Sequence, residues 1–216
     1  AVLSSTIQET FLQFEFDGYH MIEAQTPNGV EYIINLEGGS SILDAGAPDL
    51  DHFTTSIVIP DQGTTSIEVV SSSFRDYENV MVAPSKGNLS RSVIPSEVEY
   101  VYSDLYNQDS FYPGTLAELR APYILRDLRG QAVVIYPLQY NPQTKTLRVY
   151  SDIEVKVTTV GTGGENVLYR SESKRSLSRE YNNIYDDLFL NYANDTRFDY
   201  IVDEGNMLII SYGDFM

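Results

Sequence analysis

The stretch 133–158, VVIYPLQYNPQTKTLRVYSDIEVKVT, decides the class of fold that this sequence adopts. Segments 133–140 and 146–158 are rich in β-branched and aromatic residues, which favour strands. The segment 141–145 between them has the proline and polar residues of a turn, so we expect an antiparallel hairpin. Apolar residues alternate with polar ones along the second strand, which predicts one buried face and one wet face: Leu147, Val149, Ile153, Val155 and Val157.

Other segments extend this pattern over most of the chain. Strands are expected at residues 11–16, 30–36, 54–59, 66–70 and 80–82. A Pro-Asp-Gln-Gly turn separates the third from the fourth. The chain has 216 residues, and its 17 tyrosines also favour strands. We therefore predict an all-β fold, an antiparallel β-sandwich or jelly-roll-like domain.

The charge balance excludes several classes of partner. Asp and Glu total 31 against 14 Lys and Arg, giving a formal net charge of −17. Nucleic-acid binding needs a cationic surface, so no nucleic-acid partner is expected. No apolar run reaches the ~18 residues of a membrane span, so no membrane insertion is expected either. The acidity suits solubility and a cationic partner.

Residues that carry common catalytic chemistry are scarce. There is no cysteine, which excludes disulfides and thiol nucleophiles, and the two histidines, His20 and His52, are isolated from each other in the sequence. Asp44, Asp49 and Asp51 lack the spacing of a calcium loop. We predict no catalytic residue, no metal and no cofactor in this chain.

The sequence pattern of the C-terminal part differs from that of the β domain. Residues 161–179 are polar and are interpreted as a linker. Apolar residues at helical spacing then predict one amphipathic helix: Leu177, Tyr181, Ile184, Tyr185, Leu188 and Phe189. The continuous apolar run 207–212 is typical of the buried centre of a parallel α/β sheet. It is interpreted as the start of a second domain, or alternatively as a last strand of the β domain.

Several ordered blocks resemble the propeptide of the Arg-specific gingipains. They are IEVVSSSF at 67–74, VAPSKG at 82–87, ILRDLRGQ at 124–131, PLQYNP at 137–142 and TKTLR at 144–148. The resemblance implies a β-sandwich-type propeptide that occupies the active-site cleft of a secreted cysteine protease. It also implies that the catalytic Cys–His pair of a caspase-like α/β domain lies beyond Met216, so this chain is not itself an enzyme.

The resemblance further implies an organisation and a location. Residues 1–160 would be the propeptide domain, 161–197 a linker and helix leading to the activation site, and 198–216 the start of the catalytic domain, with the run 207–212 as its first strand. The precursor would be secreted or exposed at the cell surface after transit through the periplasm. Its partner would be the cognate gingipain-like catalytic domain, in cis or, after cleavage, in trans.

Two sites follow from matching the family's motifs to this sequence. Arg91, flanked by Ser90 and Ser92, matches the inhibitory arginine that enters the substrate pocket. Such a pocket has an acidic floor, and guanidinium–carboxylate pairing there is charge-assisted and often bidentate. Activation cleavage would follow Arg197, which makes Phe198 the new N-terminus.

Two other functions remain open from the residues alone. A standalone β-sandwich adhesion or glycan-binding module would use exposed tyrosines to stack on sugars. A hydrolase with two carboxylates would need a concave acidic site, and no motif points to one.

Overall fold

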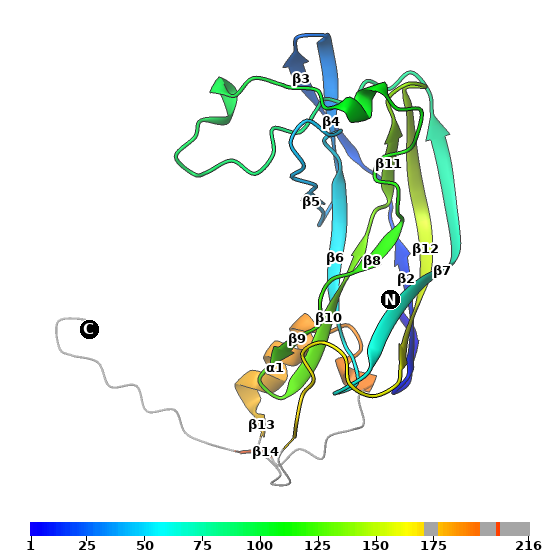
Figure 1. Ribbon diagram of the computed structural model, residues 1–216, viewed down its shortest axis with the longest axis vertical. Coiled ribbons are helices and arrows are strands. Elements are labelled where there is room, and N and C mark those ends of the chain that lie inside the picture. Colours follow the sequence, from blue (N-terminus) through cyan, green and yellow to red (C-terminus); the bar gives the residue numbers. More distant parts are fainter. Residues whose placement is uncertain (171–176, 195–201, 204–216) are drawn as a thin grey trace, which may run out of the picture.

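Two antiparallel sheets form a sandwich in the computed structural model, which describes residues 1–170, 177–194 and 202–203 (Figure 1). The first sheet has the order β1-β2-β12-β11, with β7 also paired to β12: β1 (Val2–Ser5), β2 (Glu9–Glu15), β12 (Thr146–Val160), β11 (Leu138–Asn141) and β7 (Thr64–Tyr77). The second has the order β5-β6-β10-β8, with β9 also paired to β10: β5 (Ser40–Ser41), β6 (Asp51–Val58), β10 (Leu128–Ile135), β8 (Ala117–Leu119) and β9 (Tyr123–Leu125). The predicted β-sandwich class is confirmed.

A further hairpin, short strands and short helices accompany this sandwich. The hairpin of β3 (His20–Thr26) and β4 (Gly29–Asn35) stands at one end of the molecule (Figure 1). The helical elements are η1 (Pro95–Glu97), η2 (Asp104–Asn107), α1 (Arg179–Leu188) and η3 (Tyr192–Asn194). The short strands β13 (Leu177–Ser178) and β14 (Val202–Asp203) pair in parallel.

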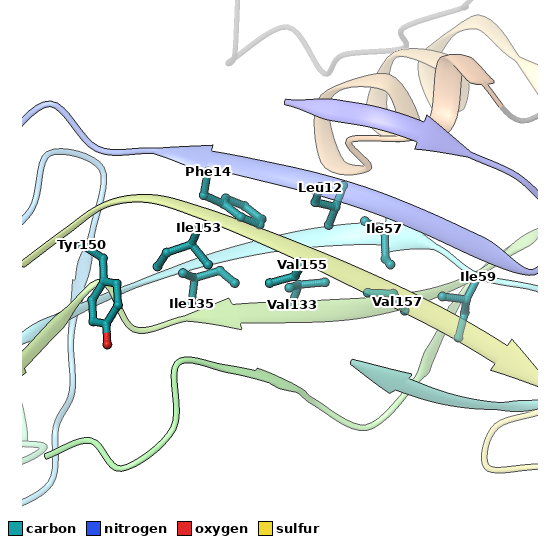
Figure 2. Packing of buried hydrophobic residues seen from close by; sticks show 10 residues of the cluster. All are labelled: Leu12, Phe14, Ile57, Ile59, Val133, Ile135, Tyr150, Ile153, Val155 and Val157. Carbon is teal, nitrogen blue, oxygen red and sulfur yellow. The ribbon is translucent and has the colours of Figure 1, made fainter. Parts of the chain in front are cut away.

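The main hydrophobic core fills the space between the two sheets. Figure 2 shows apolar side chains of both sheets meeting in this layer: Leu12, Phe14, Ile57, Ile59, Val133, Ile135, Tyr150, Ile153, Val155 and Val157. Each fully buried aliphatic side chain contributes about 1.5–3 kcal/mol relative to an exposed one. Burial of these side chains therefore holds the two sheets together.

A second core lies under the β3–β4 hairpin. It comprises Ile34, Leu36, Leu50, Val82, Leu138, Tyr140 and Leu147. Strand β12 contributes to both cores because its register against β7 shifts between Tyr150 and Asp152. Leu147 therefore packs in the second core and Ile153 in the first, so the prediction of a single buried face along 146–158 was wrong. A bulge that shifts the alternation by one residue is the physical reason.

The predicted strand 133–140 is also divided. Strand β10 ends at Ile135 in the second sheet, and β11 begins at Leu138 in the first. Pro137 lies between them, and its carbonyl accepts a hydrogen bond from the Tyr150 backbone N–H at 2.8 Å. A proline cannot donate to a sheet ladder, so the chain changes sheets there. The hairpin of β11 and β12 across residues 141–145 is as predicted.

The predicted C-terminal helix is present but shorter. Helix α1 begins at Arg179, while Leu177 belongs to β13 instead. Tyr185, Phe189 and Tyr192 pack with Val58 and Leu128 in a third cluster on the second sheet. A Cβ at Gly130 would lie 2.5 Å from Phe189 Cε1, so glycine makes room for this ring against the sheet.

Residues 161–170 are tied to the sandwich rather than forming a free linker. The buried Arg129 guanidinium donates to the carbonyls of Pro60 at 2.9 Å, Gly63 at 3.1 Å and Glu165 at 2.7 Å. Arg170 forms a two-point ion pair with Asp61. The domain boundary at residue 160 stays a prediction, and the run 207–212 lies outside the described residues.

Candidate functional site

Both ends of the loop that carries Arg91 are hydrogen-bonded to the backbone at Gly46. On entry, the Gly46 N–H donates to the Ser85 carbonyl at 2.9 Å, and the Ser85 N–H donates to the Ala47 carbonyl at 2.7 Å. On exit, the Ser103 N–H donates to the Gly46 carbonyl at 3.0 Å. We call residues 85–103 the Arg91 loop. Both of its ends are therefore held against the same short segment of backbone.

Glycine is required at this clamp. Gly46 has a φ of 81°, in the left-handed region, and a Cβ there would lie 3.0 Å from the Ser103 backbone nitrogen. Any other residue would strain the backbone and press on the exit strand of the loop. The close approach of the two loop ends thus depends on the absence of a side chain at one position.

A lysine braces the loop from within. The Lys86 ammonium donates to the Pro95 carbonyl at 2.7 Å and lies 4.1 Å from the centroid of the Tyr100 ring. These contacts join the two arms of the loop across its middle. A hollow of about 290 Å³ lies beneath, lined by both arms and by the 41–49 segment. Its lining includes Asp49, and burial together with the nearby Asp51 raises the pKa of Asp49 to about 6.

The exit arm is anchored by a tyrosine on a buried acid. Tyr102 donates its hydroxyl proton to Glu31 Oε2 at 2.5 Å, and its oxygen lies 3.0 Å from the Thr26 hydroxyl. Glu31 is 2% exposed, so this bond satisfies a carboxylate that would otherwise be costly to bury. Burial raises the pKa of Tyr102 to about 12, which keeps the phenol protonated as a donor.

Arg91 lies at the tip of the braced loop. The Val93 N–H donates to the Ser90 carbonyl at 2.9 Å, closing a turn that has Arg91 and Ser92 at its corner. The hydroxyls of Ser90 and Ser92 are 3.1 Å apart and stabilise the turn further. All three residues are exposed, and Val93 and Ile94 beside them are also exposed. The loop projects away from the sandwich near the β3–β4 hairpin (Figure 1).

Arg91 differs from the other arginines of residues 1–170. Each of these has a partner: Arg75 with the Tyr77 ring, Arg120 with Glu118, Arg126 with Asp127, Arg129 with three carbonyls, Arg148 with Asp76, and Arg170 with Asp61. Within the described residues, Arg91 has no ion pair, hydrogen bond or ring contact from its side chain. Its guanidinium is free to bind another molecule.

The second predicted site, Arg197 with Phe198, lies outside the described residues. The segment that precedes it is firmly held. Asn191 Oδ1 accepts from the Val58 N–H at 2.7 Å, and Asn191 Nδ2 donates to the Val58 carbonyl at 3.0 Å and to the Ser5 hydroxyl at 3.2 Å. The described chain before the predicted cleavage site is therefore anchored to the sandwich at Asn191.

Other candidate chemistry is not assembled in the described part of the chain. His20 is on β3 and His52 on β6, and they pair with different strands. Among the described residues, no group of three or more His, Cys, Asp or Glu could hold a metal ion. No helix in this part of the chain is long and apolar enough to cross a membrane.

The comparison with protein families gives a clear match. The model of the Propeptide_C25 family covers residues 1–189. This chain belongs to the C25 propeptide family. The propeptide is 38% identical to gingipain R2 of Porphyromonas gingivalis over 211 residues, which is 97% of this chain and 28% of that protein. It is 40% identical to gingipain R1 of the same organism over 192 residues, 88% of this chain and 19% of that protein. The C25 propeptide thus spans less than a third of these relatives.

Solved structures of related propeptides have the same fold. The complex of the pro- and mature domains of RgpB from Porphyromonas gingivalis gives a TM-score of 0.80 at 38% identity. The match covers 88% of this C25 propeptide and 96% of that chain. A structure on the zymogenic latency of gingipain K from the same organism gives a TM-score of 0.65 at 21% identity, covering 75% of this chain and 92% of that chain. The second likeness concerns the fold alone.

The family resemblance selected Arg91, whose role stays a prediction, and the sequence did not point to the residues that hold its loop. Gly46 is a turn glycine in the sequence, and nothing near it shows that it contacts Ser85 and Ser103. The contacts of Lys86 and Tyr102 also depend on tertiary structure. Composition was the one local signal, because the stretch 83–96 is rich in Pro, Gly, Ser and Asn and is typical of a long exposed loop.

Proposed function

We propose that this chain is an inhibitory propeptide that keeps an Arg-specific, gingipain-like cysteine protease latent. In this proposal Arg91 enters the substrate pocket of the catalytic domain as a substrate arginine would, and the sandwich also assists folding of that domain. The observation that carries the proposal is the exposed, unpartnered Arg91 side chain at the tip of a loop clamped at its base.

The braced loop favours tight binding. A flexible loop loses conformational freedom when it binds, and pre-organisation reduces that loss. The Gly46 clamp, the Lys86 brace and the Tyr102 anchor restrict the loop before it meets the protease. The guanidinium can then pair with an acidic pocket floor through charge-assisted, bidentate hydrogen bonds.

Exposed apolar side chains of the Arg91 loop can supply further contact area. Val93 is 39% exposed, Ile94 55% and Val101 67%. Three such side chains within one loop are unusual for a surface that faces only water, and they fit the core of a protein–protein interface. Val93 and Ile94, which follow Arg91 closely in the chain, would seal the pocket around the arginine and exclude water from its ion pair.

The chain supplies no catalytic groups in this proposal. The thiolate of the cysteine protease would come from the catalytic domain, because cysteine is absent from residues 1–216. The imidazole would come from the same domain as the other member of the family's Cys–His pair. The proposed partner is that catalytic domain, in cis before cleavage and in trans afterwards. Secretion to the cell surface through the periplasm is part of the same proposal.

Activation is proposed to occur by cleavage between Arg197 and Phe198. We propose residues 1–160 as the inhibitory domain, 161–197 as the connection to this site, and 198–216 as the start of the catalytic domain. The Asn191 anchor supports this arrangement, because it holds the preceding segment at a fixed place on the sandwich. The connection to the cleavage site would therefore start from a fixed point on the inhibitory domain.

A titration against a purified mature Arg-specific gingipain tests the proposal. The wild-type chain and Arg91→Ala are compared in their inhibition of cleavage of a small arginine substrate. We expect the variant to inhibit at least about tenfold less well, which corresponds to about 1.4 kcal/mol. Arg91→Lys keeps the charge but loses the bidentate fork, so it should fall between the two.

Arg120→Ala is the matched control. Arg120 has a largely exposed side chain paired with Glu118 beside the second sheet, so its loss should leave inhibition unchanged. Equal inhibition by wild type and Arg91→Ala would place the anchor elsewhere and refute the role of Arg91. Absence of inhibition by the wild-type chain would refute latency itself.

The glycan-binding alternative has less support. Tyr136, Tyr140, Tyr150, Tyr185 and Tyr192 are buried and take part in packing. Their rings are therefore not available to stack on a sugar. The high tyrosine content, on which that alternative depended, thus supports it less.

A further inference from the structure

Strand β7 is an unusually long strand with a free edge. It runs for 14 residues, Thr64–Tyr77, and pairs with β12 along its whole length. Within the described residues, no strand pairs with its other edge. A long edge strand with unpaired N–H and C=O groups is a template for another strand.

Most side chains of this strand are also exposed, although Ile67 packs against the main core and the Phe74 ring contacts Tyr150 and Arg148. All residues from Glu68 to Asp76 are exposed. Val69 is 37% exposed, Val70 47% and Phe74 50%. Apolar side chains on an open edge strand indicate a surface that is buried in another state of the protein.

A bulge at Val70 places two apolar residues, Val69 and Phe74, on the same face of β7. Val69 lies opposite Val155, and Ser71 lies opposite Glu154, so Val70 is an extra residue in the ladder. Because of it, Val69 and Phe74 share one face. Their partners in β12 confirm this, because Val155 and Tyr150 both belong to the main core. The neighbouring residues Glu68 and Arg75 share the opposite face, since successive side chains alternate.

This arrangement makes the strand complementary to itself. We propose that β7 pairs antiparallel with β7 of a second copy of this chain, about a two-fold axis at Ser72. With the bulge at Val70 in each strand, Val69 then lies opposite Phe74 of the second copy. Glu68 lies opposite Arg75, and each pair occurs twice. Apolar and opposite-charge cross-strand pairs each stabilise such a ladder.

The charges on β7 favour this contact, although the net charges of the two chains repel each other. Each chain has a formal net charge of −17, which opposes association. Exposed charges more than about 8 Å apart are largely screened at physiological ionic strength, so nearby pairs dominate there. On the strand itself, Asp76 is already paired with Arg148, at 2.8 Å. Glu68 lies opposite Lys156 and Arg75 lies over the Tyr77 ring, but neither forms an ion pair within the described residues, so both can pair across the axis.

The dimer leaves the Arg91 loop accessible. Strand β7 and the loop lie on opposite sides of the molecule in Figure 1, so pairing at β7 covers neither Arg91 nor its neighbours. The inference therefore goes beyond the proposed inhibition and does not depend on it. A dimer of this chain would present two inhibitory loops at once.

Sedimentation equilibrium over a range of protein concentrations tests the pairing. A contact through one strand is small, so we expect a weak, concentration-dependent dimer of the 24.4 kDa chain. Glu68→Arg and Arg75→Glu each place like charges opposite each other and should weaken association about tenfold. The double variant restores opposite charges and should recover dimerisation to within about threefold of wild type.

Two further variants separate pairing from folding. Ser72→Asp places two carboxylates at the axis without altering the Glu68 and Arg75 pairs, so it should also give monomers. Glu23→Arg makes the same charge change as Glu68→Arg on the exposed β3 strand and should dimerise at least as well as wild type. A wild-type chain that stays monomeric at all concentrations overturns the inference. So does a double variant as weak as the single variants. Inhibition of the protease is measured in parallel, and its presence or absence in the wild type bears only on the proposed latency, not on the pairing of β7.

Discussion

Replacement of Asn191 by alanine should loosen the C-terminal segment from the sandwich. The Asn191 side chain is 4% exposed and makes three hydrogen bonds, two of them to the backbone of Val58. Alanine would leave the buried Val58 N–H without its 2.7 Å acceptor. An unsatisfied buried donor costs about 1–3 kcal/mol, and the two lost donor bonds add to this. We expect a total loss of about 3 kcal/mol.

Thermal unfolding followed by circular dichroism measures this loss. For a domain of this size, 1 kcal/mol lowers Tm by about 2–4 °C, so Asn191→Ala should melt about 6–12 °C below wild type. Asn183→Ala is the matched control, because Asn183 is exposed on α1 and its replacement removes no buried partner. A Tm for Asn191→Ala within about 2 °C of wild type would show that the anchor does not hold this segment.

Two other substitutions test the base of the Arg91 loop. Gly46→Ala should destabilise the chain by about 1–2 kcal/mol from its left-handed φ alone and should weaken protease inhibition, whereas Gly18→Ala, in open space, should do neither. Inhibition and Tm unchanged in Gly46→Ala would contradict the clamp. Burial raises the pKa of Asp49 from 3.8 to about 6, so the folded chain binds that proton more tightly and stability falls as pH rises between these values. Asp49→Asn should reduce this slope and raise Tm at pH values above the raised pKa, and an unchanged profile would refute the assignment.

Local patterns were sufficient to predict the class of fold. Alternation along 146–158 and the turn before it predicted the β11–β12 hairpin, because both signals arise from neighbouring residues. The bulge at Ser151 was not predicted. An inserted residue leaves the apolar–polar alternation in the sequence looking regular, but side chains on either side of the bulge then point to opposite faces of the sheet. Pro137 was a signal for the division of the predicted strand 133–140 that was available but not used.

The candidate site was predictable only in part. Composition predicted an exposed loop around Arg91, and only the family resemblance selected Arg91 within it. That its side chain is unpartnered, unlike Arg120 or Arg148, depends on contacts between residues far apart in sequence. The clamp at Gly46 joins three segments, and no local pattern specifies which carbonyl a glycine N–H will meet.

The sheet pairing has a consequence for a chain that is cut at the tip of the Arg91 loop. Strands β6 and β7 precede the tip, while their partners β10 and β12 follow it. A single cut after Arg91 would therefore produce two interlocked fragments that complement each other as halves of a split protein. Gly46, in the first fragment, also bonds to Ser103 in the second. Such a nicked chain would keep its new carboxyl and amino ends close together and would come apart only when the whole sandwich unfolds.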